Sequence, residues 1–206
     1  MSTPRHFTMI RNFHVADWFT LANALCGAGA VLAAMAALAH DSSRYLWTAM
    51  ALVPIALVFD VLDGRVARWR HEASTLGREL DSLADVISFG MAPAAIGYAV
   101  GLDGALDVAA LVYFVACGVS RLARYNVTAE AMSAEAGKVT YFEGTPIPSS
   151  VLLVGLLAIA LATGRTGDAL WFGELAVGPF AWHPLSLLYA ISGSLMISKT
   201  LRIPKP

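Results

Sequence analysis

Long apolar segments without formal charge occupy most of the sequence and limit the folds that it can adopt. Six can be delimited: Trp18–His40, Tyr45–Phe59, Val86–Leu102, Val108–Ser120, Gly144–Gly164 and Leu175–Ser198. Hydrophobic residues make up 57% of the chain and charged residues 14%, which is more apolar surface than a soluble domain of this size can bury. A spanning helix needs about 20 predominantly apolar residues. The sequence therefore predicts an all-α membrane protein with six transmembrane helices.

Three of these segments are short for a span. The second and third, Tyr45–Phe59 and Val86–Leu102, reach the required length only if the acidic residues beside them belong to the helices. The fourth, Val108–Ser120, has a short charge-free core between Asp107 and Arg121, so its ends are the least defined.

Positive residues indicate the orientation, because short cytoplasmic loops carry an excess of Lys and Arg. With six spans, the N-terminus, the second and fourth connections and the C-terminus share one side. That side holds 12 of the 14 basic residues, namely Arg5, Arg11, Arg65, Arg68, Arg70, Arg78, Arg121, Arg124, Lys138, Lys199, Arg202 and Lys205. The other side holds Arg44 and Arg165. We therefore expect a multi-pass protein of the cytoplasmic (inner) cell membrane with both termini in the cytoplasm.

Residues 1–16 mix basic, aromatic and aliphatic side chains. This mixture suits an amphipathic segment lying at the membrane interface, and a frayed tail is the alternative. Residues 17–206 show no internal repeat or soluble appendage and are expected to form one domain. The net charge of −1 provides no basic patch of the kind that binds nucleic acid, so no nucleic-acid partner is expected.

Four carboxylates stand where two predicted spans meet the cytoplasmic side. Asp60 and Asp63 are three residues apart, and Asp81 and Asp85 are four apart. Either spacing places a pair on one face of a helix. Because the connection is short, the two helices should be antiparallel neighbours, with all four acids converging at the cytoplasmic end of the bundle.

Four ionised carboxylates cannot share such a place unless some are protonated or a cation binds between them. Oxygen ligands without His or Cys favour a hard cation, Mg²⁺, Mn²⁺ or Ca²⁺, over zinc. Ionisable residues within a membrane are functional candidates by default. The structural alternative is salt bridging of the acids to Arg65, Arg68 or Arg78.

Small residues and one arginine accompany the acids. Gly64 and Gly77 weaken a helix but allow a backbone or a ligand to approach closely, and Ala67 is also small. Arg68 presents a planar fork of donors that suits phosphate oxygens. Helix packing would explain either glycine alone. Beside four acids and an arginine, a seat for a nucleotide diphosphate is the better interpretation.

A family signature is matched without a gap by Asp60-x-x-Asp63-Gly64-x-x-Ala67-Arg68, then eight residues, Gly77, three residues, Asp81, three residues and Asp85. In these eight positions the chain resembles the CDP-alcohol phosphotransferases. Members of that family are six-span membrane enzymes, commonly homodimers, with the active site at the cytoplasmic face. The resemblance implies this fold, a homodimer and a divalent metal cofactor, Mg²⁺ or Mn²⁺, which Ca²⁺ can replace in a structure.

The resemblance also implies a role for each position. The first three acids would bind the metal, and Asp85 would act as the general base and also touch a metal. The small residues would let the cytidine and ribose approach, and Arg68 would lie beside the phosphates or brace the acids. In the first span, Thr20 and Asn23 are candidates for a nucleotide contact, with hydrogen bonding between helices as an equal alternative.

Segments outside the signature resemble the bacterial and archaeal phosphatidylserine synthase branch of the family. They are Thr20–Asn23 with Cys26-Gly27, Ser88–Ala94, Arg121–Asn126 and Phe142–Pro148. The likeness extends from Asp17 to Ser150. It implies transfer of a phosphatidyl group from CDP-diacylglycerol to L-serine with release of CMP, in contact with membrane lipids.

Serine as an acceptor needs a cation for its carboxylate and a hydrogen-bond acceptor for its ammonium group. Arg121 and Arg124 are the candidate cations, with interfacial anchoring as the alternative for both. Asn126 or Glu143 is the candidate partner of the ammonium group.

Other functions are compatible with parts of this pattern. A sister enzyme of the same family would use glycerol 3-phosphate, an inositol phosphate or another alcohol, or an archaeal-type ether-lipid donor. An acceptor with a second phosphate would demand more cationic side chains. A cation transporter would carry its acids near the midplane of the membrane, whereas these cluster at one face. A scaffold protein that has lost catalysis would not need the intact signature.

Overall fold

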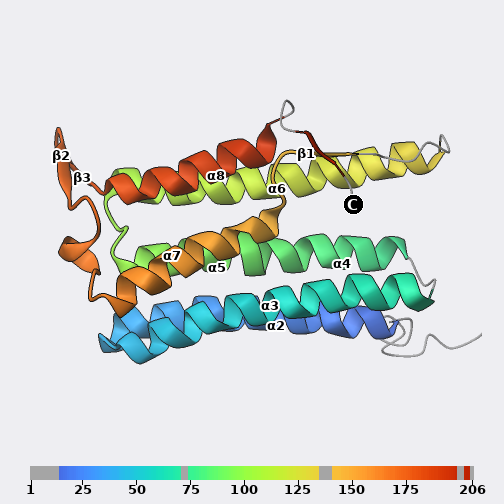
Figure 1. The fold of residues 1–206 in the computed structure, drawn as a ribbon, viewed down its shortest axis with the longest axis horizontal. Helices are drawn as coiled ribbons and strands as arrows, with labels where there is room; N and C mark the ends of the chain where they lie inside the picture. The colour runs from blue at the N-terminus through green and yellow to red at the C-terminus, as the bar shows by residue number, and fades with distance from the viewer. Residues whose placement is uncertain (1–13, 71–73, 135–140, 199–201, 205–206) are drawn as a thin grey trace, which may run out of the picture.

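The computed structural model describes residues 14–70, 74–134, 141–198 and 202–204. Its helices run close to the long axis of an elongated bundle (Figure 1). The long elements are α2 (Val15–His40), α3 (Ser43–Arg70), α6 (Ala105–Ala134) and a continuous rod of α4 (Thr75–Asp85), the π-helical turn η1 (Val86–Met91) and α5 (Ala92–Val100). Most of the predicted interfacial segment, residues 1–13, lies outside the described residues.

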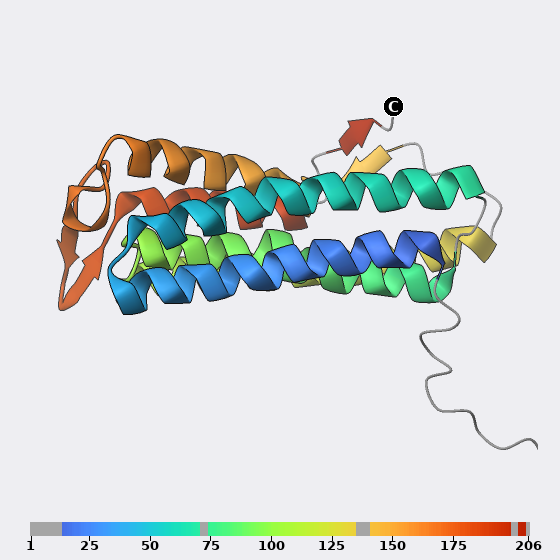
Figure 2. The same cartoon turned by 90° about the horizontal axis from the view of Figure 1, so that it is seen from below.

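Two shorter helices complete the bundle. They are α7 (Val151–Ala162), which follows the 3₁₀ turn η2 (Ile147–Ser150), and α8 (Leu187–Ile197), which follows the 3₁₀ turn η4 (Pro184–Ser186). Between them lie the 3₁₀ turn η3 (Gly167–Ala169) and an antiparallel hairpin of β2 (Leu175–Val177) and β3 (Phe180–Trp182). Both views show α7 and α8 beside only the half of the bundle nearest this hairpin (Figures 1 and 2). β1 (Tyr141–Glu143) pairs antiparallel with β4 (Arg202–Pro204).

The prediction of an all-α fold with six transmembrane helices is confirmed in part, because the described residues are mostly helical but also form two short antiparallel strand pairs. Among the described residues, four helices are long and apolar enough to cross a membrane, and they contain the first, second and fourth predicted spans and all but the last two residues of the third. The acidic residues beside the second and third spans do belong to the helices. The fourth span was predicted too short, because α6 continues well past Arg121.

The fifth and sixth predicted spans differ more from the structure. Their helical parts are Ile147–Ala162 and Pro184–Ile197, both shorter than the spans predicted from hydropathy. The predicted start of the sixth span at Leu175 is wrong, because residues 175–182 form the hairpin. Gly178 turns the chain there with a φ of 61°, a backbone conformation that suits glycine. A charge-free hairpin and a charge-free helix have the same hydropathy, so composition did not separate them.

Small side chains on α2 let it lie close to α3. Ala30, Ala34 and Ala37 of α2 are buried, as are Ala49 and Ala56 of α3. Small residues allow helix backbones in membranes to approach each other. The sequence therefore places small residues along the contact between α2 and α3, and larger apolar side chains of α2, such as Leu25 and Leu32, point outward.

The π-helical turn η1 packs tightly on α2. A Cβ atom added at Gly27 would lie 2.6 Å from the Cα atom of Ser88, so only glycine fits there. The Ser88 hydroxyl donates a 2.9 Å hydrogen bond to the carbonyl oxygen of Asn23. α2 and the third span are thereby fixed in one register at the point where the acidic helix α4 ends.

We predict that Gly27→Ala destabilises the protein. The new methyl group would overlap backbone atoms of Ser88, and overpacking of this kind costs about 1–3 kcal/mol. Thermal unfolding of the purified protein in detergent would measure the effect.

Gly155→Ala is the matched control. Among the described residues, no atom lies within 4 Å of a Cβ atom added at this helical position, and alanine favours a helix over glycine by about 1 kcal/mol. Equal melting temperatures for Gly27→Ala and Gly155→Ala would contradict the proposed fit between α2 and η1.

Candidate active site

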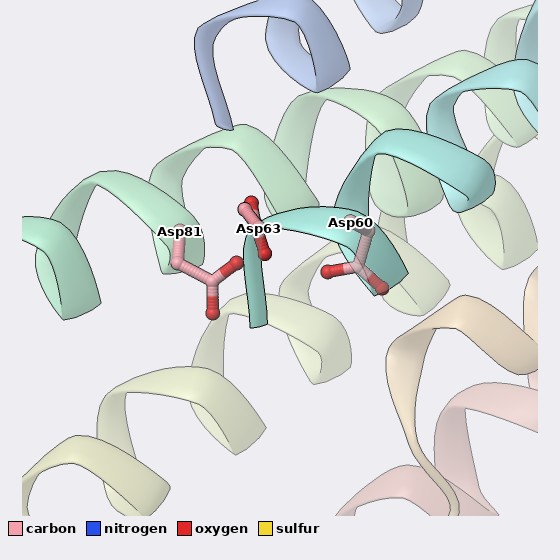
Figure 3. A group of neighbouring side chains, drawn as sticks. All are labelled: Asp60, Asp63 and Asp81. Atoms are coloured by element: carbon pink, nitrogen blue, oxygen red, sulfur yellow. The ribbon is translucent and has the colours of Figure 1, made fainter. Parts of the chain in front are cut away.

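The acidic residues of the signature converge as the spacing predicted. Asp60 and Asp63 come from α3 and Asp81 from α4, and one carboxylate oxygen from each lies within 4.8 Å of the other two (Figure 3). Asp63 is buried and the other two are half-buried. Asp85, one turn beyond Asp81, is buried and lies within hydrogen-bonding reach of Asp60. All four carboxyl groups therefore share one site.

The first span joins this site through two polar side chains. Thr20 donates a 2.8 Å hydrogen bond from its hydroxyl to Oδ2 of Asp63. Asn23 donates from Nδ2 to Oδ1 of Asp85 at 3.3 Å. Both side chains thus make hydrogen bonds between helices, and their contact with a nucleotide stays a prediction. Their partners are the signature acids themselves, so α2 orients one carboxyl group from each acidic helix.

These carboxylates have the chemistry of a cation site. Two oxygens that bind the same hard cation are separated by at most about twice a metal–oxygen bond of 2.0–2.6 Å, which suits the spacing of up to 4.8 Å. Within the described ranges, Asp81 Oδ1 is buried without a hydrogen-bond partner, although buried polar atoms normally have one. Three oxygen donors and one unsatisfied buried oxygen fit a divalent metal.

Salt bridging does not explain the acids. In the part of the chain that the structure describes, no ion pair joins them to Arg65, Arg68 or Arg78. Arg68 is exposed and folds back on its own helix, so that a Cβ atom added at Gly64 would lie 3.5 Å from Arg68 Nη1. Its guanidinium group is thus at the mouth of the site, without a carboxylate partner among the four acids.

The remaining small residues of the signature have different surroundings. Ala67 is half-buried on α3. Gly77 accepts no side chain easily, because an added Cβ atom would lie 3.0 Å from both Asp17 Oδ1 and Ser74 Oγ. Ser74 caps α4 by accepting a 2.9 Å hydrogen bond from the Gly77 amide, as serine commonly does at a helix start. Gly77 therefore lets the start of α4 approach the start of α2.

Sequence reasoning missed the part played by Asp17. This carboxylate is 3% exposed, accepts a 2.8 Å hydrogen bond from the His14 amide, and is close enough to interact electrostatically with Asp63. A fifth acid therefore adds negative charge at the edge of the site. The available signal was its place directly before an apolar run, as with the acids that precede the third span.

The four candidates for acceptor contact separate in the structure. Arg121 is half-buried and within electrostatic range of Asp85, and its Nε is buried and has no hydrogen-bond partner among the described residues. Arg124 Nη1 donates to the carbonyl oxygen of Ile197 at 3.4 Å, at the end of α8. Arg121 is therefore directed to the acids, and Arg124 to a helix terminus.

Asn126 has protein partners for its side-chain amide group. Asn126 donates from Nδ2 to Ser82 Oγ at 3.0 Å and to Glu79 Oε2 at 3.3 Å, which links α6 to α4. The side chain of Glu143 lies outside the described residues.

Comparison with known proteins agrees with this geometry. The profile of the CDP-alcohol phosphatidyltransferase family matches residues 13–187. The chain belongs to this family. The matched region contains every acid of the site and all four long helices, since α2 begins at Val15 and α6 ends at Ala134. The resemblance seen in the signature is thereby confirmed over most of the chain.

Relatives with a named activity show which members of the family the chain is similar to. The chain is 41% identical over 208 aligned residues to the CDP-diacylglycerol–serine O-phosphatidyltransferase of Saccharomyces cerevisiae, covering all of this chain and 75% of the relative. It is 40% identical to the protein of that name from Helicobacter pylori (strain 26695), covering 64% of this chain and 54% of the relative. The Methanocaldococcus jannaschii protein of that name is 32% identical, covering 72% of this chain and 62% of the relative.

We predict that Thr20→Val lowers the rate of CMP release by at least about tenfold, because a hydrogen bond to a charged group is worth about 1.5–3 kcal/mol and Asp63 would lose one. The purified protein assayed with a CDP-linked lipid would show the change.

Thr48→Val is the matched control for this substitution. Thr48 makes a hydrogen bond to the carbonyl oxygen of Arg44, four residues earlier, just as Thr20 also bonds to Ala16, but it lies in the first turns of α3, away from the acids. Comparable losses in both variants would show that the Thr20–Asp63 contact has no special importance.

Proposed function

We propose that this chain is a phospholipid-synthesis enzyme that transfers the phosphatidyl group of CDP-diacylglycerol to the hydroxyl group of L-serine, giving phosphatidylserine and CMP. The observation that carries the proposal is the convergence of three carboxylates within 4.8 Å, with Asp85 against Asp60, in a chain of this family. The relatives named for this reaction support serine as the acceptor.

In this proposal Asp60, Asp63 and Asp81 hold a divalent metal, Mg²⁺ or Mn²⁺, which Asp85 also approaches. A bound metal would neutralise charge on the diphosphate and polarise the phosphorus. Thr20 fixes the Asp63 carboxylate by donating to Oδ2. α2 thus orients a proposed metal ligand of α3 but supplies no metal ligand of its own.

Asp85 is the proposed general base. It would accept the proton of the serine hydroxyl as the oxygen attacks the lipid-linked phosphorus, while CMP leaves. Asn23 donates to its Oδ1, which holds the carboxyl group in one orientation. Burial of Asp85 at 6% exposure keeps bulk water from competing with serine for the phosphatidyl group.

The nucleotide would lie along the mouth of the site. Gly64 and Ala67 offer a smooth surface on α3 for the cytidine and ribose. The family signature assigns the same role to Gly77 on α4, which packs against Asp17 and Ser74. Arg68, exposed beside Gly64, is placed to donate to the phosphates. These assignments follow the family signature, and the proximity of Arg68 to Gly64 supports them.

Arg121 is the proposed partner of the serine carboxylate. Its position near Asp85 would bring the serine hydroxyl to the base when the carboxylate pairs with the guanidinium group. The buried Nε with no partner within the described residues leaves a donor for that contact.

The membrane arrangement is part of the proposal. α7 and α8 with their 3₁₀ turns would be the fifth and sixth spans, with the acids and both termini on the cytoplasmic side of the inner membrane. Residues 17–206 would form one catalytic domain, residues 1–16 an interfacial segment, and two chains a homodimer. The excess of basic residues on one side supports the orientation.

The decisive experiment is an acceptor panel. The purified protein, CDP-diacylglycerol and Mn²⁺ are incubated separately with serine, glycerol 3-phosphate, an inositol phosphate and water, and CMP and lipid products are measured. We expect phosphatidylserine with serine and little product otherwise. Product from glycerol 3-phosphate but none from serine would refute the acceptor while leaving the family reaction intact.

Asp85→Asn serves as the matched variant in the same panel. It keeps the shape of the side chain but removes the base, so CMP release with serine should fall by at least about 100-fold, within the usual range for general base catalysis. Mn²⁺ binding, measured by calorimetry, should be partly retained because three other carboxylates form the close group. Turnover equal to wild type would exclude Asp85 as the base.

A second prediction concerns Arg121. Arg121→Lys should raise the KM for serine by about 10- to 100-fold, since lysine cannot reproduce a bidentate contact with a carboxylate, and should change the KM for CDP-diacylglycerol little. Arg124→Lys is the control, because Arg124 contacts the Ile197 carbonyl oxygen. An unchanged KM for serine in Arg121→Lys would remove Arg121 from the acceptor site.

A further inference from the structure

The hairpin between α7 and α8 has an unusual surface for a loop. β2 reads Leu-Ala-Val and β3 reads Phe-Ala-Trp, so neither strand carries a polar residue on either face. All three residues of β2 are exposed, and so are Phe180 and, just before the hairpin, Phe172 at 77%. A hairpin with one face in water normally alternates apolar and polar residues. Its surface resembles the lipid-facing sides of the helices.

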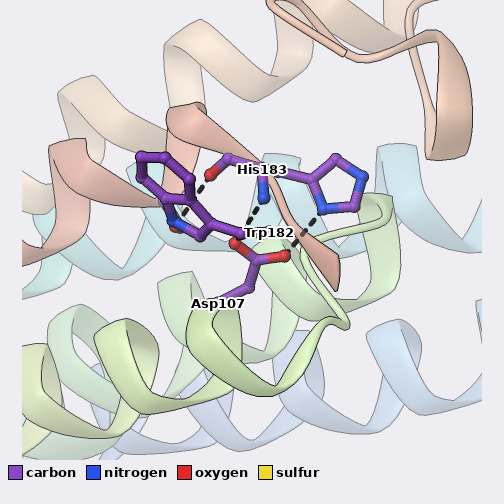
Figure 4. A network of polar contacts seen from close by, with 4 residues as sticks. Asp107, Trp182 and His183 are labelled. Atoms are coloured by element: carbon purple, nitrogen blue, oxygen red, sulfur yellow. Dashed lines mark hydrogen bonds and ion pairs between the residues drawn. The ribbon is translucent and has the colours of Figure 1, made fainter. Parts of the chain in front are cut away.

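A buried polar network holds this hairpin in place. Asp107, in the first turn of α6, accepts hydrogen bonds from the His183 backbone amide at 2.9 Å and from the His183 ring at Nδ1, 2.7 Å away (Figure 4). Both side chains are at most 3% exposed. Trp182 Nε1 donates to Ser186 Oγ at 3.1 Å. The end of β3 is therefore fixed to α6 and η4.

Close backbone contact strengthens this attachment. The carbonyl group of Ala181 lies against Gly104, where an added Cβ atom would overlap it and come within 2.9 Å of Asp107 Oδ2. The inner edge of the hairpin is thus packed on the start of α6, and its outer edge, with the exposed apolar side chains, is presented in a fixed direction.

The helices beside the hairpin are too short to cross a bilayer unaided. η2 and α7 have 4 and 12 residues, which rise about 26 Å, and η4 and α8 have 3 and 11 residues, which rise about 22 Å. The hydrocarbon layer is about 30 Å thick. Both helices lie in the half of the bundle nearest the hairpin (Figures 1 and 2), so the hairpin continues the apolar surface at that end.

The hairpin lies just beyond the end of the bundle that is opposite α4 (Figure 1). It is at the same end of the bundle as the turn between α2 and α3 (Figures 1 and 2), where Tyr45 and Trp47 are exposed. Tyr and Trp concentrate at membrane–water interfaces. The two strands satisfy each other's backbone groups, which a segment close to hydrocarbon requires.

We propose that the β2–β3 hairpin is a membrane-interface anchor: it inserts its exposed apolar edge among the phospholipids of the leaflet opposite the acidic site. The Asp107–His183 network sets its depth by fixing β3 to α6. Arg165, Asp168 and Glu174, which precede the strands, would remain in the headgroup region and water.

Site-directed spin labelling in lipid nanodiscs tests this proposal. Single cysteines replace Val177 or Phe180 in a chain whose native cysteines are removed by Cys26→Ala and Cys117→Ala. Collision of each label with oxygen, which concentrates in lipid, and with a water-soluble nickel complex is measured. Lipid-inserted labels should collide mainly with oxygen and several-fold less with nickel than a label in water does.

Two further positions calibrate the measurement. Leu32→Cys, on the exposed apolar side of α2, represents lipid, and Asp103→Cys, exposed in the connection before α6, represents water at the same end of the bundle. Hairpin labels that behave like Asp103→Cys would overturn the proposal. Labels shielded from both reagents would also overturn it, because they would indicate contact with protein, such as a second copy of the chain.

Discussion

α2 joins the two acidic helices, α3 and α4, into one site. It packs against both α3 and α4, and it donates one hydrogen bond to a carboxyl group of each, from Thr20 to Asp63 and from Asn23 to Asp85. Carboxylates this close repel one another strongly in a medium of low polarity. Fixed donors from a third helix offset part of that repulsion and prevent the acids from turning apart, so the architecture of the site depends on these two contacts.

The positions of the acids could be predicted from sequence because helical spacing alone determines which face they share. Their partners on α2 could not, since a threonine or an asparagine in an apolar helix can bond to any neighbouring helix. Asp17 was missed for the same reason: its proximity to Asp63 depends on how α2 crosses the bundle. Arg124 and Asn126 had the right chemistry for a ligand, but the structure gives them protein partners at Ile197 and Ser82.

Hydropathy located the first four spans and overestimated the lengths of the last two. It measures apolar character, which α8 and the hairpin share, and it contains no information on backbone direction at Gly178. The attachment of the hairpin to α6 could not be predicted from the sequence either, because Asp107 and His183 are 76 residues apart in the chain. The two ends of the bundle thus use buried acids differently: one collects several that need a counter-charge, and the other satisfies a single acid with a histidine and a backbone amide.

The π-helical turn η1 widens the helical backbone between Asp85 and α5. A π turn closes its hydrogen bonds one residue further along than an α turn does. The wide turn at Val86–Met91 therefore takes up one extra residue with little rotation of the helices on either side of it, so Asp85 keeps its contact with Asn23 of α2 while α5 stays packed. Deleting one residue from this turn would convert it into a regular α-helix and would change the backbone that Gly27 contacts at Ser88, so its consequence would appear at the contact with α2 and not in the direction of the acids.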